Sequence, residues 1–274
     1  MVTLPLLAGR PGRFRTCEPA AWRWGCGRRH AQLDACRSKL ERLRVTEHLQ
    51  TAKRSTKAEQ RAASIEQILD AAEDLFARHG LYGVTLKEVA KQVGVHHTLL
   101  NYYFADKKSL FDTVFARRAR VTAERRMNAL DEYDAASSGK PTIEGALRAF
   151  LDTDLDLYIE GGDPWKNYAQ LSAQVANTPQ WGAELMDEHF DPVVLRLIGL
   201  LRRALPGCAE EDIFWGYHFV TGALMNTLAR TGRIDKLSGG LCTSDDFVAV
   251  KDRMASFMAA GFLAICHPHS SGKS

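Results

Sequence analysis

Apolar and polar positions between residues 64 and 110 follow the period of short helices. The first run repeats its apolar residues every three or four positions, which places them on one face of a helix. These residues are Ile65, Ile68, Leu69, Ala72, Leu75 and Phe76. Gly80 follows the run, and a glycine ends helices because it enters the left-handed conformation without a Cβ clash. The pattern predicts a helix that ends at about His79.

A second short helix is predicted directly afterwards. Thr85 is a good N-cap residue, and Glu88, three positions later, completes a capping box. The apolar face consists of Leu86, Val89, Ala90 and Val93. Gly94 then breaks the helix, so this stretch predicts a helix followed by a tight turn.

A third helix is predicted over residues 97–103. Leu100 and Phe104 lie four positions apart and face inward, which leaves a polar face outward. The outward residues are His97, Thr98, Asn101 and Tyr102. Asp106 is a good N-cap for a fourth helix. The arrangement suits the placement of one small helix in a DNA major groove.

Helical patterns continue through the rest of the chain. The fourth helix is predicted to run to about Leu130, and residues 131–141 have the polar composition of a loop. Further helices are predicted over residues 142–160, from Asp163 as N-cap with Pro164 at the first position, from Pro179 with an interruption or kink at Pro192, and over residues 210–230 and 244–265. Strand-like alternation and internal repeats are missing from the sequence. We therefore expect an all-α fold, with three helices for DNA followed by a bundle of five or six.

Four features of residues 64–110 occur together: the capped TLKEVA helix, the GV turn, the outward-polar helix that ends in YYF, and DKKSL at the start of the next helix. In this combination the segment resembles the DNA-binding domain of the TetR/AcrR family of bacterial transcriptional regulators. The remainder to about residue 266 resembles the family loosely, as an all-helical domain of the expected length. The resemblance implies a helix-turn-helix DNA-binding domain over residues 56–110 and an effector-binding and dimerisation domain over residues 111–266.

The resemblance also implies a function. We expect a cytoplasmic, ligand-responsive regulator, most simply a repressor, that binds a palindromic double-stranded DNA operator as a homodimer. A small, mostly apolar effector, acyl or aromatic, would release it by moving the fourth helix. The alternative is an architectural or ligand-independent helix-turn-helix protein, which a tightly packed bundle without a pocket would favour.

The DNA contacts implied by the resemblance are carried over by position. His97, Thr98 and Asn101 are expected to contact base edges. Five residues are expected to contact phosphates: Thr85, Lys87, Tyr102, Tyr103 and Lys107. Tyr103 has the alternative role of a core aromatic, and His97 that of a solvent-exposed side chain. Two positions depart from the family: His96 replaces the usual Ser, Thr or Asn cap, and Asn101 stands where Tyr is common. A histidine ring caps poorly, and asparagine can bond adenine, so the operator sequence does not follow from relatives.

Charge is distributed unevenly along the chain. Residues 1–60 carry 13 basic and 5 acidic side chains, residues 61–126 carry 11 and 8, and residues 127–274 carry 12 and 20. A basic front half suits a polyanionic partner. The motifs HExxH, GxSxG, the P-loop and GxGxxG in a strand-helix setting do not occur, so we do not expect an enzyme.

Cofactors, metals and membranes are not expected partners. The six cysteines show no zinc-like spacing, and we expect them to be reduced. Asp152, Asp154 and Asp156 alternate and cannot share one helical face, which argues against an acidic metal site. The longest uncharged stretch is too short to span a bilayer and fits a buried helix.

The C-terminal half carries the expected effector site and dimer interface. Aromatic residues and one histidine in its middle form the candidate effector site: Phe150, Tyr158, Trp165, Tyr168, Trp181, Phe190, Trp215 and His218. Each of them also fits an ordinary core position. Large apolar residues of the last two helices form the expected dimer interface, with filling of the protomer core as the alternative: Phe214, Tyr217, Phe219, Leu224, Leu228, Phe247, Phe257, Met258, Phe262 and Ile265.

Residues 1–55 are rich in Arg, Gly, Trp and Cys and show little periodicity. Three readings stay open: a mis-assigned translation start, with the protein beginning at a codon such as that of Val45; a disordered basic tail; or an arm that adds phosphate contacts. Residues 267–274 are expected to form a disordered tail.

Overall fold

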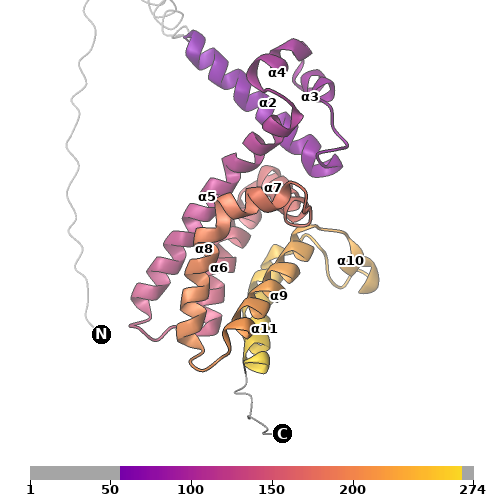
Figure 1. The fold of residues 1–274 in the computed structure, drawn as a ribbon. Coiled ribbons are helices and arrows are strands. Elements are labelled where there is room, and N and C mark those ends of the chain that lie inside the picture. The colour runs from indigo at the N-terminus through magenta and orange to yellow at the C-terminus, as the bar shows by residue number, and fades with distance from the viewer. Residues whose placement is uncertain (1–55, 267–274) are drawn as a thin grey trace, which may run out of the picture. The chain divides into compact units, whose positions relative to one another are not determined.

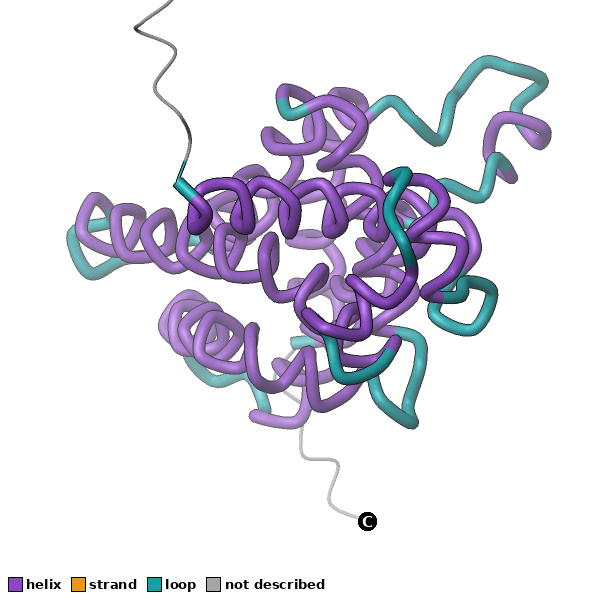
Figure 2. The backbone as a smooth tube through the Cα atoms, turned by 90° about the horizontal axis from the view of Figure 1, so that it is seen from above, coloured by secondary structure: helices purple, strands orange, loops and turns teal. Residues whose placement is uncertain are grey.

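The computed structural model describes residues 56–266 as helices joined by loops (Figure 1). This part of the chain contains no strand (Figure 2), which confirms the all-α prediction. None of its helices combines the length and the apolar character needed to cross a membrane. The predictions for residues 1–55 and 267–274 lie outside the described residues.

The N-terminal unit consists of α2 (Lys57–His79), α3 (Leu86–Val93) and α4 (His97–Tyr103). Its local signals are confirmed. The Thr85 hydroxyl oxygen accepts the Glu88 backbone N–H at 3.3 Å, and the Glu88 carboxylate accepts the Thr85 backbone N–H at 2.7 Å. Gly94 ends α3 with a φ of 77°. Leu100 and Phe104 are buried and join α4 to the core of this unit.

Helix α5 (Lys107–Ala136) begins at its predicted cap, Asp106, but ends six residues later than predicted. The helix continues after Leu130 because two of its aspartates are paired with Arg196. Asp131 and Asp134 accept hydrogen bonds from Arg196 at 2.7 and 2.8 Å. The predicted loop was therefore wrong for residues 131–136, where paired charges stabilise a helix.

Helix α5 continues into the C-terminal bundle. The other helices of the bundle are α6 (Ile143–Glu160), α7 (Gly162–Ala176), α8 (Gly182–Ala204), α9 (Glu210–Leu228), the short α10 (Arg233–Leu237) and α11 (Phe247–Ile265). Helix α5 packs against α6 and α8, and α11 packs against α6 and α9. Helix α2 packs against α5 and α7, so two helices of the bundle support the DNA-binding unit (Figure 1). The short α10 was not predicted.

Three predicted helix starts are wrong. Helix α11 begins at Phe247, three residues after the predicted start at residue 244. Helix α7 begins at Gly162 without a side-chain cap, so Asp163 lies inside the first turn. Helix α8 begins at Gly182, because the residues from Pro179 form a turn first. A Cβ on Gly182 would lie 1.9 Å from the Val175 carbonyl oxygen, so only glycine permits this close approach.

Helix α8 also passes through Pro192 without interruption. Proline lacks the N–H that would bond to the preceding turn, which weakens the helix locally. Phe190, Val193 and Leu197 are buried on either side and hold the backbone in helical form. Tertiary packing therefore outweighs the lost hydrogen bond at this position.

A disulfide joins Cys208, just before α9, to Cys266, just after α11. The expectation of reduced thiols is wrong for these two residues. Helices α9 and α11 run side by side, and a Cβ on Gly216 would lie 2.2 Å from the Phe262 ring. This contact brings the two cysteine Cα atoms to 4.8 Å. Cys242 is free and exposed, and the other three cysteines lie outside the described residues.

Candidate DNA-binding surface and effector region

Helix α4 is capped by a histidine ring. The His96 Nδ1 accepts the Thr98 backbone N–H at 3.4 Å and lies 2.9 Å from the Thr98 hydroxyl oxygen. The long first bond agrees with the expectation that histidine is a poor cap. The His97 ring packs against the His96 ring with centroids 4.4 Å apart. The His96 side chain therefore contacts those of both His97 and Thr98 at the first turn of α4.

The polar face of α4 is open to solvent. Thr98 and Asn101 are exposed, and Tyr102 is 72% exposed. His97 and Tyr103 are only partly exposed, and Tyr103 packs against the core. The structure thus places Tyr103 between its two predicted roles, with its ring against the core and its edge at the surface.

Polar and basic groups surround this face. Lys87 on α3 is exposed, and Lys107 at the start of α5 lies over the exposed Tyr82 ring at 5.9 Å. The Thr85 hydroxyl donates its proton to the Glu88 carboxylate at 2.8 Å, a bond that lowers the pKa of Glu88. While the capping box is intact, Thr85 has no hydroxyl proton to donate to a phosphate.

Sequence reasoning missed Arg61 and Tyr82 in this region. The Arg61 guanidinium lies over the rings of Tyr102 and Tyr103, at 5.8 and 5.4 Å from their centroids. The apolar stripe of α2 begins only at Ile65, so it gave no indication of this contact, although Arg61 lies one turn earlier on the same helical face. Arg61 adds a cation beside the two tyrosines.

A charged junction connects this unit to the bundle. Glu73 of α2 is 2% exposed and accepts hydrogen bonds from both Arg117 and Arg118 of α5. Arg117 also bonds to Glu66 and Asp70 of α2, at 3.0 and 2.8 Å. Helices α2 and α5 are therefore joined by several charged hydrogen bonds, which are stronger than neutral ones.

The same junction extends to α7 and α8. The Gln174 side chain donates to the Ala77 carbonyl oxygen at 2.7 Å, which links α7 to the end of α2. Phe111 packs edge-on against Phe76 of α2, at 5.1 Å, and against Trp181, at 4.9 Å. A movement of α5 or α7 would therefore reach the DNA-binding unit through direct contacts.

A buried polar cluster lies in the middle of the bundle. Arg126 of α5 pairs with Asp154 of α6 at 2.8 Å, and their side chains are 7% and 4% exposed. The Tyr158 hydroxyl donates to Asp154 at 3.2 Å. The Tyr168 hydroxyl of α7 lies 3.3 Å from the Thr122 hydroxyl. Burial raises the pKa of Asp154 although Arg126 opposes it, and burial also raises the pKa of both tyrosines.

Five predicted effector residues line or adjoin this cluster: Phe150, Tyr158, Trp165, Tyr168 and Phe190. The Phe150 ring lies 4.3 Å from the Arg126 guanidinium carbon. Phe190 is 5.7 Å from the same carbon. Trp165 packs against Tyr168 at 6.0 Å and so borders the cluster.

The structure separates three other predicted effector residues from the cluster. Trp181 lies at the junction with Phe111. Trp215 is 50% exposed and His218 is exposed, both on the outer face of α9 beside Phe219. Grouping these two with the buried aromatics was wrong, because the inner face of α9 consists of Ile213, Gly216, Val220 and Leu224.

Sequence reasoning missed Arg126 and set Asp154 aside as one of three alternating aspartates. The available signal was that Asp154 interrupts the apolar stripe of α6, between the buried residues Leu151, Leu155 and Tyr158. A charge on a buried face requires a partner, and that partner is Arg126. No group of three or more metal-ligating side chains occurs within residues 56–266.

The predicted dimer residues divide into two sets. Leu224, Leu228, Phe247 and Phe262 are buried and fill the protomer core, as in the alternative reading. Phe214, Phe219 and Phe257 are 43%, 54% and 73% exposed. Tyr217, Met258 and Ile265 are partly exposed. Trp215, Val248 and Leu263 add exposed apolar surface on the same two helices.

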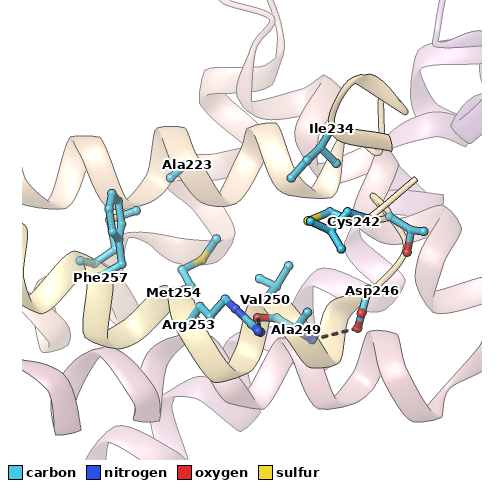
Figure 3. Close-up of a pocket in the computed structure, with 12 residues that line it drawn as sticks. Ala223, Ile234, Cys242, Asp246, Ala249, Val250, Arg253, Met254 and Phe257 are labelled. Carbon is cyan, nitrogen blue, oxygen red and sulfur yellow. Dashed lines mark hydrogen bonds between the residues drawn. The ribbon is translucent and has the colours of Figure 1, made fainter. Parts of the chain in front are cut away.

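A groove opens between α9, α10 and α11, with a volume of about 510 Å³ (Figure 3). Ala223 and Ile234 lie across it from Val250, Met254 and Phe257 of α11. Its lining is mostly apolar, and it adjoins the exposed aromatic residues of α9 and α11.

Two family models match the chain, and together they span more than half of it. Residues 68–114 match bacterial regulatory proteins of the tetR family, and residues 148–261 match the tetracyclin repressor-like C-terminal domain. The HTH-type transcriptional regulator BetI of Escherichia coli O17:K52:H18 (strain UMN026 / ExPEC) is 22% identical over 171 residues. That match covers 62% of this chain and 85% of the relative.

Solved structures share the fold at low sequence identity. The ketosteroid transcriptional regulator KstR2 of Mycobacterium tuberculosis has a TM-score of 0.52 at 14% identity, with 72% of this chain and 93% of that chain covered. A mutant of the HlyIIR protein has a TM-score of 0.51 at 21% identity, with 72% and 97% covered. The first family model spans α3 and α4, and the second spans α7 to α10. The chain belongs to the TetR family of DNA-binding transcriptional regulators, which are not enzymes.

Proposed function

We propose that this protein is a repressor that binds a palindromic operator as a homodimer and is released by a small, mostly apolar effector. One observation supports this most directly: a single helix, α5, carries Lys107 beside α4 and Arg126 in the buried cluster. Nineteen residues of helix separate them, or about 28 Å. A rigid element of this length can transmit a displacement at the cluster to the DNA-binding unit.

The recognition helix of the proposal is α4. Thr98 and Asn101 reach base edges from its exposed face, with His97 at the rim. Asn101 is suited to pair with adenine, whose N6 and N7 match an amide group. Lys87, Tyr102, Tyr103 and Lys107 hold phosphates, and Thr85 contributes through its position at the N-terminus of α3.

The dimer of the proposal forms through α9 and α11. One α4 reads few base pairs, and two copies on a palindrome supply useful specificity. The exposed rings of Phe214, Phe219 and Phe257 provide the apolar surface for this interface. A Cβ at Gly222 or Gly261 would meet no described atom within 4 Å, so both backbones are open to close approach by a partner helix.

The switch of the proposal is a shift between two states. The effector binds the bundle in a form in which the two α4 helices no longer match the half-site spacing. For this to work, the effector must bind the DNA-incompetent state more tightly than the competent one.

Selection of genomic DNA fragments with the purified protein tests the DNA-binding part. We expect enrichment of a two-fold symmetric motif with half-sites about 10 base pairs, or one helical turn, apart. Asn101→Ala should reduce affinity for the selected site by about 1–3 kcal/mol and relax the preference at one base pair per half-site. Asn128→Ala, an exposed asparagine of the bundle half of α5, is the matched control and should leave affinity unchanged. Enrichment without symmetry, or equal behaviour of the two variants, would contradict the proposal.

A ligand-independent DNA-binding protein is the second candidate. It is favoured by the small size of the cavity at the buried cluster, about 10 Å³. If a compound that raises the melting temperature of the protein also weakens operator binding, the ligand-released repressor is favoured. If no such compound weakens operator binding, the ligand-independent protein is favoured.

A further inference from the structure

Five buried polar side-chain atoms among the described residues lack hydrogen-bond partners, and two of them belong to one ion pair. These two are Arg126 Nε and Asp154 Oδ1, and neither has a partner among the described residues. Their side chains pair through other atoms, Nη2 and Oδ2, at 2.8 Å. A buried donor or acceptor without a partner destabilises a protein, and native structures contain few of them. One ion pair therefore holds both an unused donor and an unused acceptor.

Both side chains line one cavity. Helices α5 to α9 all contribute to its wall, with Tyr158, Tyr168 and Ser172 as the other polar residues. The rest of the wall is apolar and consists of Met186, Phe190, Met225 and Leu228. A mainly apolar wall around a few oriented polar groups is typical of sites for small molecules.

The electrostatics of the cluster disfavour a charged ligand. Arg126 and Asp154 neutralise one another, and Tyr158 and Tyr168 stay uncharged because burial raises the pKa of both hydroxyls. Burial also raises the pKa of Asp154, so its carboxylate already lacks full stabilisation. A ligand carboxylate would bring a second negative charge beside it, and no described cation of the cavity wall is left to offset that charge.

We propose that the effector held at this cluster is an uncharged, mainly apolar molecule with a hydroxyl or primary carboxamide group. The oxygen of that group accepts the Arg126 Nε–H, and its own O–H or N–H donates to Asp154 Oδ1. Such a group satisfies both orphan atoms at once and leaves the net charge at zero. The inference rests on the proposed function, because it names the chemical class of the effector on which that function depends.

Entry of such a molecule requires the helices to separate. The present cavity of about 10 Å³ holds no more than one water-sized group. Met186 and Met225 lie in its wall, and methionine side chains adapt readily to a new occupant. The effector therefore binds best to an expanded bundle, in which α5 and α6 have moved relative to α8 and α9. This preference for one state is what a two-state switch needs.

Two matched series of probes test the head-group preference on the full protein. One consists of octanol, octanamide and octanoate, and the other of phenylbutanol, phenylbutanamide and phenylbutanoate. Binding is measured by calorimetry at neutral pH, and contact with Arg126 by the NMR signal of its side-chain Nε–H. In at least one series, we expect the alcohol or amide to bind tenfold or more tightly than the carboxylate and to shift the Arg126 signal. The inference is overturned if the carboxylate binds as tightly as its neutral partners, or if no probe shifts that signal.

Asp154→Asn provides a second, independent readout. It leaves the Arg126 charge without a counter-ion, so the preference should reverse toward the carboxylate of the same series. Glu144→Gln removes a partly exposed carboxylate, which pairs with Arg148, from the same helix and should leave the preference unchanged. If Asp154→Asn does not fold, the wild-type series alone decides. Operator binding of the same protein is measured without probe: its absence with the neutral preference intact refutes the proposed function, whereas operator binding without the neutral preference refutes only this inference.

Discussion

Replacing Lys107 by alanine should reduce the salt dependence of operator binding. Lys107 lies at the N-terminus of α5, over the exposed Tyr82 ring, where the helix dipole also favours an anion. In a homodimer the change removes two lysine–phosphate contacts. Each contact contributes about 0.9 to the slope of log affinity against log salt, so the slope should fall by about 1.8. Between about 50 and about 200 mM salt, the wild-type protein should therefore lose on the order of tenfold more affinity than the variant.

Fluorescence anisotropy of a labelled operator at several salt concentrations measures this slope. Lys108→Ala is the matched control, because the neighbouring Lys108 pairs with Asp112 on its own helix and lies 6.0 Å from the Trp181 ring. The control should keep the wild-type slope. Equal slopes for wild type and Lys107→Ala, or an equal reduction in both variants, would refute the docking of α5 against the DNA backbone.

Three further predictions concern the fold and the dimer. Reduction of the Cys208–Cys266 disulfide opens a loop with a sequence separation of 58 residues. It should cost about 4 kcal/mol and lower the melting temperature by about 10 °C in calorimetry with and without reductant, and an unchanged value would contradict the structure. Phe257→Asp should convert the dimer to a monomer in light scattering, whereas Leu195→Asp, exposed on α8, should not; two dimeric variants would exclude α11 from the interface. Glu73→Gln should lower the free energy of unfolding in urea by about 3 kcal/mol, because it leaves two arginines without their buried partner. Glu66→Gln, at the exposed edge of the same junction, should cost less than about 1 kcal/mol, and equal costs would mean that burial of Glu73 does not matter.

The DNA-binding unit was predictable because its determinants are local. The capping box of Thr85 and Glu88, the turn at Gly94 and the inward pair of Leu100 and Phe104 all act within a few residues of each other. Their backbone consequences follow from side-chain chemistry and helix period alone. The structure reproduces α3 and α4 at the expected positions for this reason.

The effector region was less predictable because its determinants are distant in sequence. Arg126 and Asp154 belong to different helices, and only the packing of α5 against α6 brings them together. Trp215 and His218 have the residue types of a pocket, but the period of α9 turns them outward. The disulfide likewise depends on the pairing of α9 with α11, which no local pattern specifies.

Reciprocal linkage between the two sites tests the central claim, that a molecule bound at the buried cluster controls DNA binding through α5. The operator dissociation constant is measured with and without a saturating amount of the tightest-binding neutral probe, and the probe dissociation constant with and without saturating operator. Both constants should rise by the same factor, about 5- to 150-fold, because coupling between two binding sites is reciprocal. If the probe binds at Arg126 and both constants stay unchanged, the two sites are independent and α5 does not couple them.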